Sequence, residues 1–115
     1  MHELRRHPKV GASWEGFALE SLIAHLGARP EECYFWATHA GAELDLLVVR
    51  GRTRLGFEFK YSEAPKATRS MRTAMADLGL RNLQVIHAGQ RTFPIGRGIE
   101  AVAFPDLAKA VKPLR

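Results

Sequence analysis

Residues 43–60 read ELDLLVVRGRTRLGFEFK, and this segment sets the architecture of the chain. Two β-prone runs, 43–50 and 54–60, are joined by a short polar connection, which is typical of a hairpin. Side chains alternate between the two faces of a strand. In the first strand, alternation predicts one face with Leu44, Leu46 and Val48 and the other face with Glu43, Asp45, Leu47 and Val49. In the second strand, it predicts one face with Phe57 and Phe59 and the other face with Glu58 and Lys60.

Two acidic side chains, one on each strand, are the candidates for chemistry. With the expected register, Asp45 and Glu58 project from the same face of the sheet, and Lys60 shares that face. Two carboxylates at one point repel each other unless a cation lies between them, and a hard divalent ion such as Mg²⁺ prefers oxygen ligands. Such an ion can polarise a phosphodiester and lower the pKa of a bound water, while a nearby lysine stabilises the developing negative charge.

The alternative is that Glu58 and Lys60 form a solvated strand face with a weak surface salt bridge. The setting favours the cluster, because Asp45 is an isolated acid inside an apolar strand, where an unpaired carboxylate is costly.

The remaining elements follow from helical and strand periodicity. Ser13 is a suitable N-cap for the first helix and Gly27 a suitable end for it. The expected elements are a helix at 13–26, strands at 34–38, 43–50 and 54–60, a helix at 66–80, strands at 83–87 and 99–104, and a final helical turn at 105–111, with a loop at 92–98. The order α-β-β-β-α-β-β-α predicts an α/β fold with a mixed β-sheet flanked by helices.

Length and composition indicate one ordinary globular domain. The chain has 115 residues, of which 46% are hydrophobic and 25% charged. Its net charge of +5 favours acidic partners such as nucleic acid. Its single cysteine, Cys33, cannot form an internal disulfide, and the sequence has neither a membrane-spanning stretch nor a signal peptide, so the expected location is the cytoplasm. We expect residues 1–9 to be a flexible segment or linker remnant and residues 10–115 to form the domain.

Three short phrases carry a family resemblance. GASWE at 11–15, GAELD at 41–45 and GFEFK at 56–60 resemble the PD-(D/E)XK superfamily, which includes restriction endonucleases. With Tyr34-Phe-Trp36, they are more closely similar to the DUF4143 domain found C-terminal to AAA-type P-loop ATPase modules. The similarity runs through nearly the whole chain. Leu44 stands where the proline that gives the superfamily its name would precede Asp45.

The resemblance implies a restriction-endonuclease-like fold and a role for each site residue. Asp45 and Glu58 would be ligands of Mg²⁺ or Mn²⁺, and Lys60 would be the catalytic lysine. Glu15 would be the acid of the first helix, with Glu20 as the competing candidate. Glu43 belongs to the closer family's phrase and is as consistent with a structural contact as with a catalytic one.

Two functions fit these features. The first is a Mg²⁺-dependent nuclease, a hydrolase of phosphodiester bonds. The second is a non-catalytic nuclease-like module for nucleic-acid binding, oligomerisation or regulation of an attached AAA-type ATPase. The expected partners are nucleic acid (DNA in preference to RNA), the ATPase module and a second copy of the chain. No membrane partner is expected. This sequence has no Gly-x-x-x-x-Gly-Lys-Ser/Thr phosphate loop of its own.

Basic residues at 66, 69 and 72 are the expected nucleic-acid contacts. Lys66, Arg69 and Arg72 lie three apart, so within the predicted helix they gather on one face and could contact phosphates. A solvated helix face is the alternative.

Overall fold

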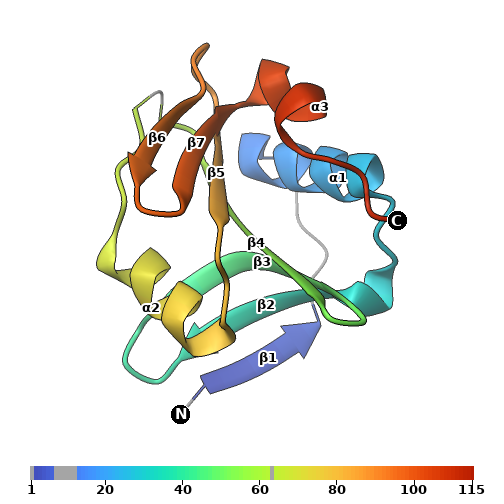
Figure 1. Ribbon diagram of the computed structural model, residues 1–115, viewed down its shortest axis with the longest axis vertical. Coiled ribbons are helices and arrows are strands. Elements are labelled where there is room, and N and C mark those ends of the chain that lie inside the picture. Colours follow the sequence, from blue (N-terminus) through green and yellow to red (C-terminus); the bar gives the residue numbers. More distant parts are fainter. Residues whose placement is uncertain (1, 7–12, 63) are drawn as a thin grey trace.

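A computed structural model describes residues 2–6, 13–62 and 64–115. Its elements, shown in Figure 1, are β1 (His2–Arg6), α1 (Trp14–Leu26), the 3-10 turn η1 (Pro30–Glu32), β2 (Cys33–Thr38), β3 (Glu43–Arg50), β4 (Thr53–Lys60), α2 (Arg69–Leu78), β5 (Leu83–His87), β6 (Phe93–Gly96), β7 (Ile99–Ala103), the 3-10 turn η2 (Phe104–Asp106) and α3 (Leu107–Ala110). Within the described residues the strands form one sheet of seven, in the order β1-β2-β3-β4-β5-β7-β6.

The sheet is mixed. β4, β5 and β7 pair in parallel, whereas the β1–β2, β2–β3, β3–β4 and β6–β7 pairs are antiparallel. A helical crossover, α2, connects the parallel pair β4 and β5, as such a connection requires. The predicted α/β architecture, a mixed sheet flanked by helices, is therefore confirmed.

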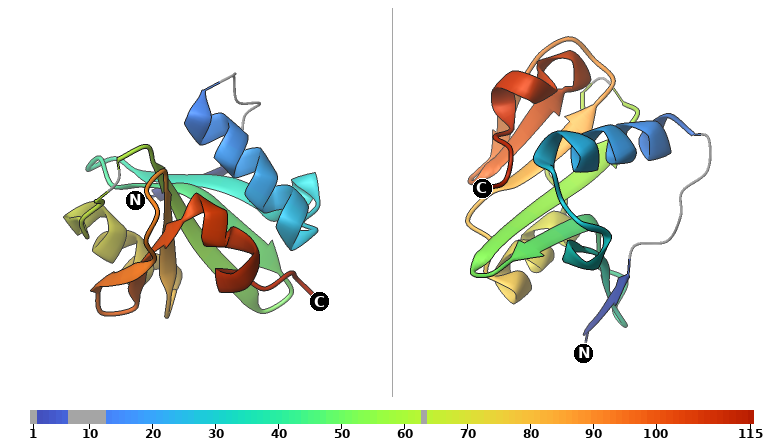
Figure 2. Two further views of the ribbon diagram at one scale, coloured as in Figure 1. Left: turned by 90° about the horizontal axis from the view of Figure 1, so that it is seen from above. Right: turned by 90° about the vertical axis from the view of Figure 1, so that its right-hand side faces the viewer.

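Two apolar cores lie on opposite faces of the sheet. The ribbon shows α1 and α3 on one side of the sheet and α2 on the other (Figure 2). On one face, α1 and α3 cover Leu46, Val48, Phe57 and Phe59. On the other face, α2 covers a second cluster, whose strand members are Trp36, Leu44, Leu47, Leu83, Val85 and Ile99. Burial of apolar surface on both sides fixes the sheet between its helices and supports the polar groups at the strand ends.

Local signals set the helix ends. The Ser13 side chain accepts a hydrogen bond from Gly16 N at 3.1 Å, and Gly27 ends α1 with φ 71°, as predicted. The second helix begins three residues later than predicted, because Thr68 caps it by accepting from Met71 N at 3.2 Å. Lys66 therefore precedes α2 instead of lying on it.

Two strands were not predicted from the sequence. Residues 2–6, expected to be a flexible segment, form β1, which pairs antiparallel with β2. Residues 1 and 7–9 of that segment lie outside the described residues. The stretch expected to be a loop at 92–98 contains β6, an edge strand where Pro94 and Gly96 are tolerated because one side of the strand needs no partner. The order α-β-β-β-α-β-β-α thus lacks these two strands.

An irregularity in β3 changes the predicted faces. Tyr34 pairs with Leu47, but Trp36 pairs with Leu44, so β3 has one more residue than β2 over this stretch. Leu44 consequently packs with Leu47 on the α2 side, while Leu46 packs on the α1 side. The prediction that Leu44 shares a face with Leu46 is wrong, because the bulge interrupts alternation beside Asp45.

Candidate functional site

The carboxylates of Asp45 and Glu58 meet where β3 and β4 stop pairing. The described ladder between these strands runs from Arg50 opposite Thr53 to Leu46 opposite Phe57. One residue further, Glu58 Oε2 accepts a hydrogen bond from Asp45 N at 2.8 Å. Asp45 Oδ2 accepts one from Phe59 N at 2.9 Å. Each side chain thus reaches the backbone of the opposite strand, and both acids lie at one point of the sheet.

These contacts also explain how the strands separate without losing backbone partners. A buried N–H group needs an acceptor, and the strand ladder no longer supplies one beyond Leu46 and Phe57. The two carboxylates take that place. Each carboxylate has lone pairs beyond the one that accepts the backbone hydrogen bond, so the contacts do not exhaust its capacity to bind a cation.

Burial and mutual repulsion dominate the electrostatics of this pair. Glu58 is only 7% exposed. Its burial and the neighbouring charge of Asp45 raise its pKa to about 8. The hydrogen bond from the Asp45 amide and the charge of Lys60 act in the opposite direction but are weaker. Burial also raises the pKa of Asp45, although the hydrogen bond from Phe59 and the charge of Lys60 oppose this. The site therefore disfavours two negative charges in the absence of a cation.

Lys60 and Glu43 lie at the margin of the pair. Both are exposed, and the Lys60 ammonium lowers the pKa of both acids, whereas the Glu43 carboxylate raises both. The backbone of Glu43 has a structural contact: its N–H donates to Ser70 Oγ at 2.8 Å, and Ser70 Oγ donates to its carbonyl at 3.1 Å. Sequence reasoning missed Ser70, because a serine in a first helical turn does not reveal a partner 27 residues away.

Of the two candidate acids on α1, Glu15 is the one whose charge reaches the pair. Glu15 raises the pKa of Asp45, and Glu20 is not among the groups that shift it. Both side chains are exposed. The first turn of α1 is held at this end of β4 by aromatic contact, since the Trp14 ring packs edge-on against Tyr61 with centroids 5.7 Å apart.

The three predicted nucleic-acid contacts do not form one helical face. Lys66, Arg69 and Arg72 are all exposed. Only Arg69 and Arg72 belong to α2, and Arg72 extends toward β6, where a Cβ on Gly96 would lie 2.9 Å from its Nη2. Their predicted role in binding phosphates stays a prediction.

A second buried carboxylate, that of Glu32, lies at the opposite end of β3. It was not predicted as a site residue from the sequence. Arg50 donates to it through Nε at 2.8 Å and through Nη2 at 2.9 Å, and Arg29 N donates at 2.8 Å. These hydrogen bonds, that from Arg50 foremost, lower the pKa of Glu32 to about 2. The arrangement joins η1 to the end of β3 and resembles a structural ion pair.

The described residues contain no group of three or more His, Cys, Asp or Glu side chains arranged to hold a metal ion. No helix in the described part of the chain is long and apolar enough to cross a membrane.

Comparison with known proteins places the chain in a family. It matches the family described as "Domain of unknown function (DUF4143)" over residues 10–107. It is 46% identical over 99 residues to an uncharacterized protein of Mycobacterium bovis, Mb2031c, covering 86% of this chain and 22% of that protein. The same figures hold for the uncharacterized protein Rv2008c of Mycobacterium tuberculosis. The chain thus spans about a fifth of the length of these curated relatives, and no solved structure matches it significantly. Because the family match covers most of its length, the chain belongs to the DUF4143 family.

Proposed function

We propose that this domain is a PD-(D/E)XK-type nuclease that hydrolyses nucleic-acid phosphodiester bonds with the help of Mg²⁺ or Mn²⁺. The observation that carries the proposal is the meeting of Asp45 and Glu58 where β3 and β4 separate, with Lys60 two residues further along β4. Two acids and a lysine at one strand end are the groups that such a hydrolysis needs.

The donor set fits a hard divalent ion. Asp45 and Glu58 supply carboxylate oxygens, and Mg²⁺ is commonly held by one or two carboxylates, with water and substrate phosphate filling its other positions. When bound, the ion would polarise the phosphate and lower the pKa of a water.

The chain's own residues then have distinct tasks. Asp45 and Glu58 would hold the ion through their carboxylate oxygens. Lys60, exposed beside them, stabilises the negative charge that develops on the phosphate oxygens. Glu15, exposed at the start of α1, would orient the attacking water. Glu43 adds negative charge at the margin, which favours a cation.

The test is metal binding and cleavage by matched variants. Asp45→Asn and Glu58→Gln keep side chains of the same shape that still accept the backbone hydrogen bonds. We expect both to lose Mg²⁺ and Mn²⁺ binding by calorimetry and to lose cleavage of single-stranded, duplex and branched DNA. Asp77→Asn, which removes an exposed carboxylate on α2, is the control and keeps both properties. A wild-type chain that binds neither metal contradicts the proposal.

A second candidate function also has a specific observation in its favour. The side chains of Asp45 and Glu58 each accept a hydrogen bond from a backbone amide of the opposite strand. A purely structural role, in which they hold the two strands together, would account for both acids. The domain would then be a non-catalytic module that binds nucleic acid, forms oligomers or regulates an attached AAA-type ATPase. In that case Asp45→Asn changes stability, and neither wild type nor variant binds the metal or cleaves DNA.

A further inference from the structure

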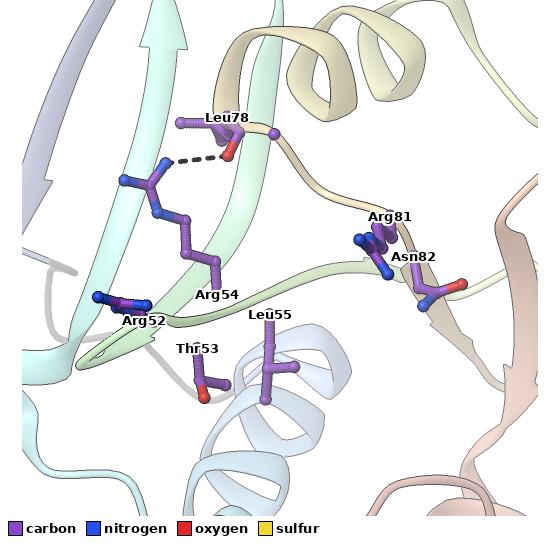
Figure 3. Close-up of a pocket in the computed structure, with 8 residues that line it drawn as sticks. Arg52, Thr53, Arg54, Leu55, Leu78, Arg81 and Asn82 are labelled. Carbon is purple, nitrogen blue, oxygen red and sulfur yellow. Dashed lines mark hydrogen bonds between the residues drawn. The ribbon is translucent and has the colours of Figure 1, made fainter.

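A hollow lined by arginines lies at the opposite end of β4 from the carboxylate pair. It has a volume of about 470 Å³ and is lined by Arg52, Thr53, Arg54, Leu55, Leu78, Gly79, Arg81 and Asn82. Figure 3 shows that these residues come from two segments, the β3–β4 hairpin and the end of α2 with the connection that follows it. We call the hollow between Arg52, Arg54 and Arg81 the arginine pocket.

The charge of this pocket is unbalanced. None of the described residues that line it is acidic. Among residues 13–62 and 64–115, no carboxylate forms a salt bridge with Arg52, Arg54 or Arg81. Arg54 is held in place by donating from Nη1 to the carbonyl of Leu78 at 3.0 Å, a contact that also satisfies the end of α2. The pocket therefore presents several guanidinium donors with no anion of its own.

We propose that the arginine pocket binds a backbone phosphate of a nucleic acid, an inference that rests on the proposed function for its choice of ligand. Guanidinium groups match the geometry of phosphate oxygens, and phosphate contacts position a nucleic acid without reading its sequence. The side chains of Thr53 and Asn82, at the same hollow, add neutral donors for such an oxygen.

The position of the pocket relative to the carboxylate pair favours nucleic acid over an acidic peptide. Arg54 and Glu58 lie four residues apart on β4, which is roughly 13 Å along a strand. The helix α2 links the two places, because Ser70 at its start contacts Glu43 and Leu78 at its end contacts Arg54. A duplex has one phosphate per strand about every 3.4 Å of its axis, so this separation corresponds to about four nucleotides.

Binding without cleavage tests the pocket separately from the chemistry. The affinity of a short fluorescent DNA duplex is measured by anisotropy in EDTA, at several salt concentrations between about 50 and 200 mM. We expect Arg52→Gln with Arg81→Gln to weaken binding roughly tenfold or more and to lower the slope of log affinity against log salt by about 2. This double variant leaves the contact between Arg54 and Leu78 intact, so folding is preserved.

A charge-matched control separates the pocket from net charge. Lys109→Gln with Lys112→Gln removes the same charge near the C-terminus, where both side chains are exposed, and is expected to change affinity and slope far less. Equal effects of the two double variants, or stronger competition by polyglutamate than by unlabelled DNA, overturn the pocket. If the arginine variant binds normally while Asp45→Asn abolishes cleavage, the pocket fails and the nuclease stands. The reverse result leaves a phosphate-binding pocket on an inert domain.

Discussion

The two ends of β3 hold buried carboxylates in opposite electrostatic states. Near Arg50, Glu32 receives two hydrogen bonds from one guanidinium, and its pKa falls to about 2. At the Asp45 end, Glu58 lies against a second acid, and its pKa rises to about 8. The same chemical group is therefore stabilised as an anion at one end and destabilised as an anion at the other. The first arrangement serves the fold, whereas the second retains an electrostatic cost that a cation can relieve.

Breaking the Glu32 arrangement is expected to give the largest loss of stability among these variants. Glu32→Gln removes the charge opposite Arg50, whose guanidinium is left without its anion. The folded pKa lies below the ordinary 4.5, so the stabilisation is present above pH 4.5 and disappears as the pH falls through about 2.

Urea denaturation across pH measures this difference. Wild type is expected to exceed Glu32→Gln clearly at pH 7, with the gap closing toward pH 2. Glu31→Gln, the exposed neighbour, is the control. A constant gap at every pH would show that the contribution is packing and not charge.

Neutralising Glu58 is expected to have the opposite sign. The folded pKa of about 8 lies above the ordinary 4.5, so ionisation opposes folding: the penalty is absent below pH 4.5, grows between pH 4.5 and 8, and is complete above pH 8. Glu58→Gln should therefore raise the free energy of unfolding at pH 9 by on the order of a few kcal/mol and leave it nearly unchanged at pH 4. Denaturation at those two values measures the effect. A variant that is destabilised at pH 9 contradicts the electrostatic account of this end.

Loosening the start of β3 without touching a charge is expected to have a smaller effect. Ser70→Ala removes two hydrogen bonds to the Glu43 backbone, which costs about 1 kcal/mol of unfolding free energy. Ser21→Ala on α1, where no hydrogen bond of the side chain is described, serves as the comparison. Amide hydrogen exchange at Glu43 checks whether the loss is local. Unchanged protection there would mean that Ser70 does not hold this strand end.

Local sequence signals predicted much of this fold. The cap at Ser13, the stop at Gly27 and the positions of the strands predicted at 43–50 and 54–60 depend on neighbouring residues, and each agrees with the structure to within one residue. The edge strand β6 was missed because Pro94 and Gly96 indicate a loop unless a partner strand is known. The bulge beside Asp45 depends on its pairing with β2, which no local pattern shows.

The polar sites show the same contrast between features that local sequence predicts and features that depend on the tertiary fold. Asp45 and Glu58 were predicted to lie close together because they stand on neighbouring strands of a local hairpin, and the structure brings them together. The pairing of Glu32 with Arg50 joins residues 18 apart, and the arginine pocket combines a hairpin with the end of a distant helix. Such assemblies require the tertiary fold, so single-sequence patterns could not reveal them.

The central claim, that Asp45 and Glu58 form a metal site, is tested most directly by counting the protons released when Mg²⁺ binds. Calorimetry in buffers of different ionisation enthalpy gives that number. With a pKa of about 8, Glu58 holds its proton at pH 7 and must release it to become a ligand. We predict release of close to one proton per bound ion at pH 7, falling toward zero well above pH 8, and none in Glu58→Gln. Mg²⁺ binding without proton release at pH 7, or no binding by the wild-type chain, would contradict the account.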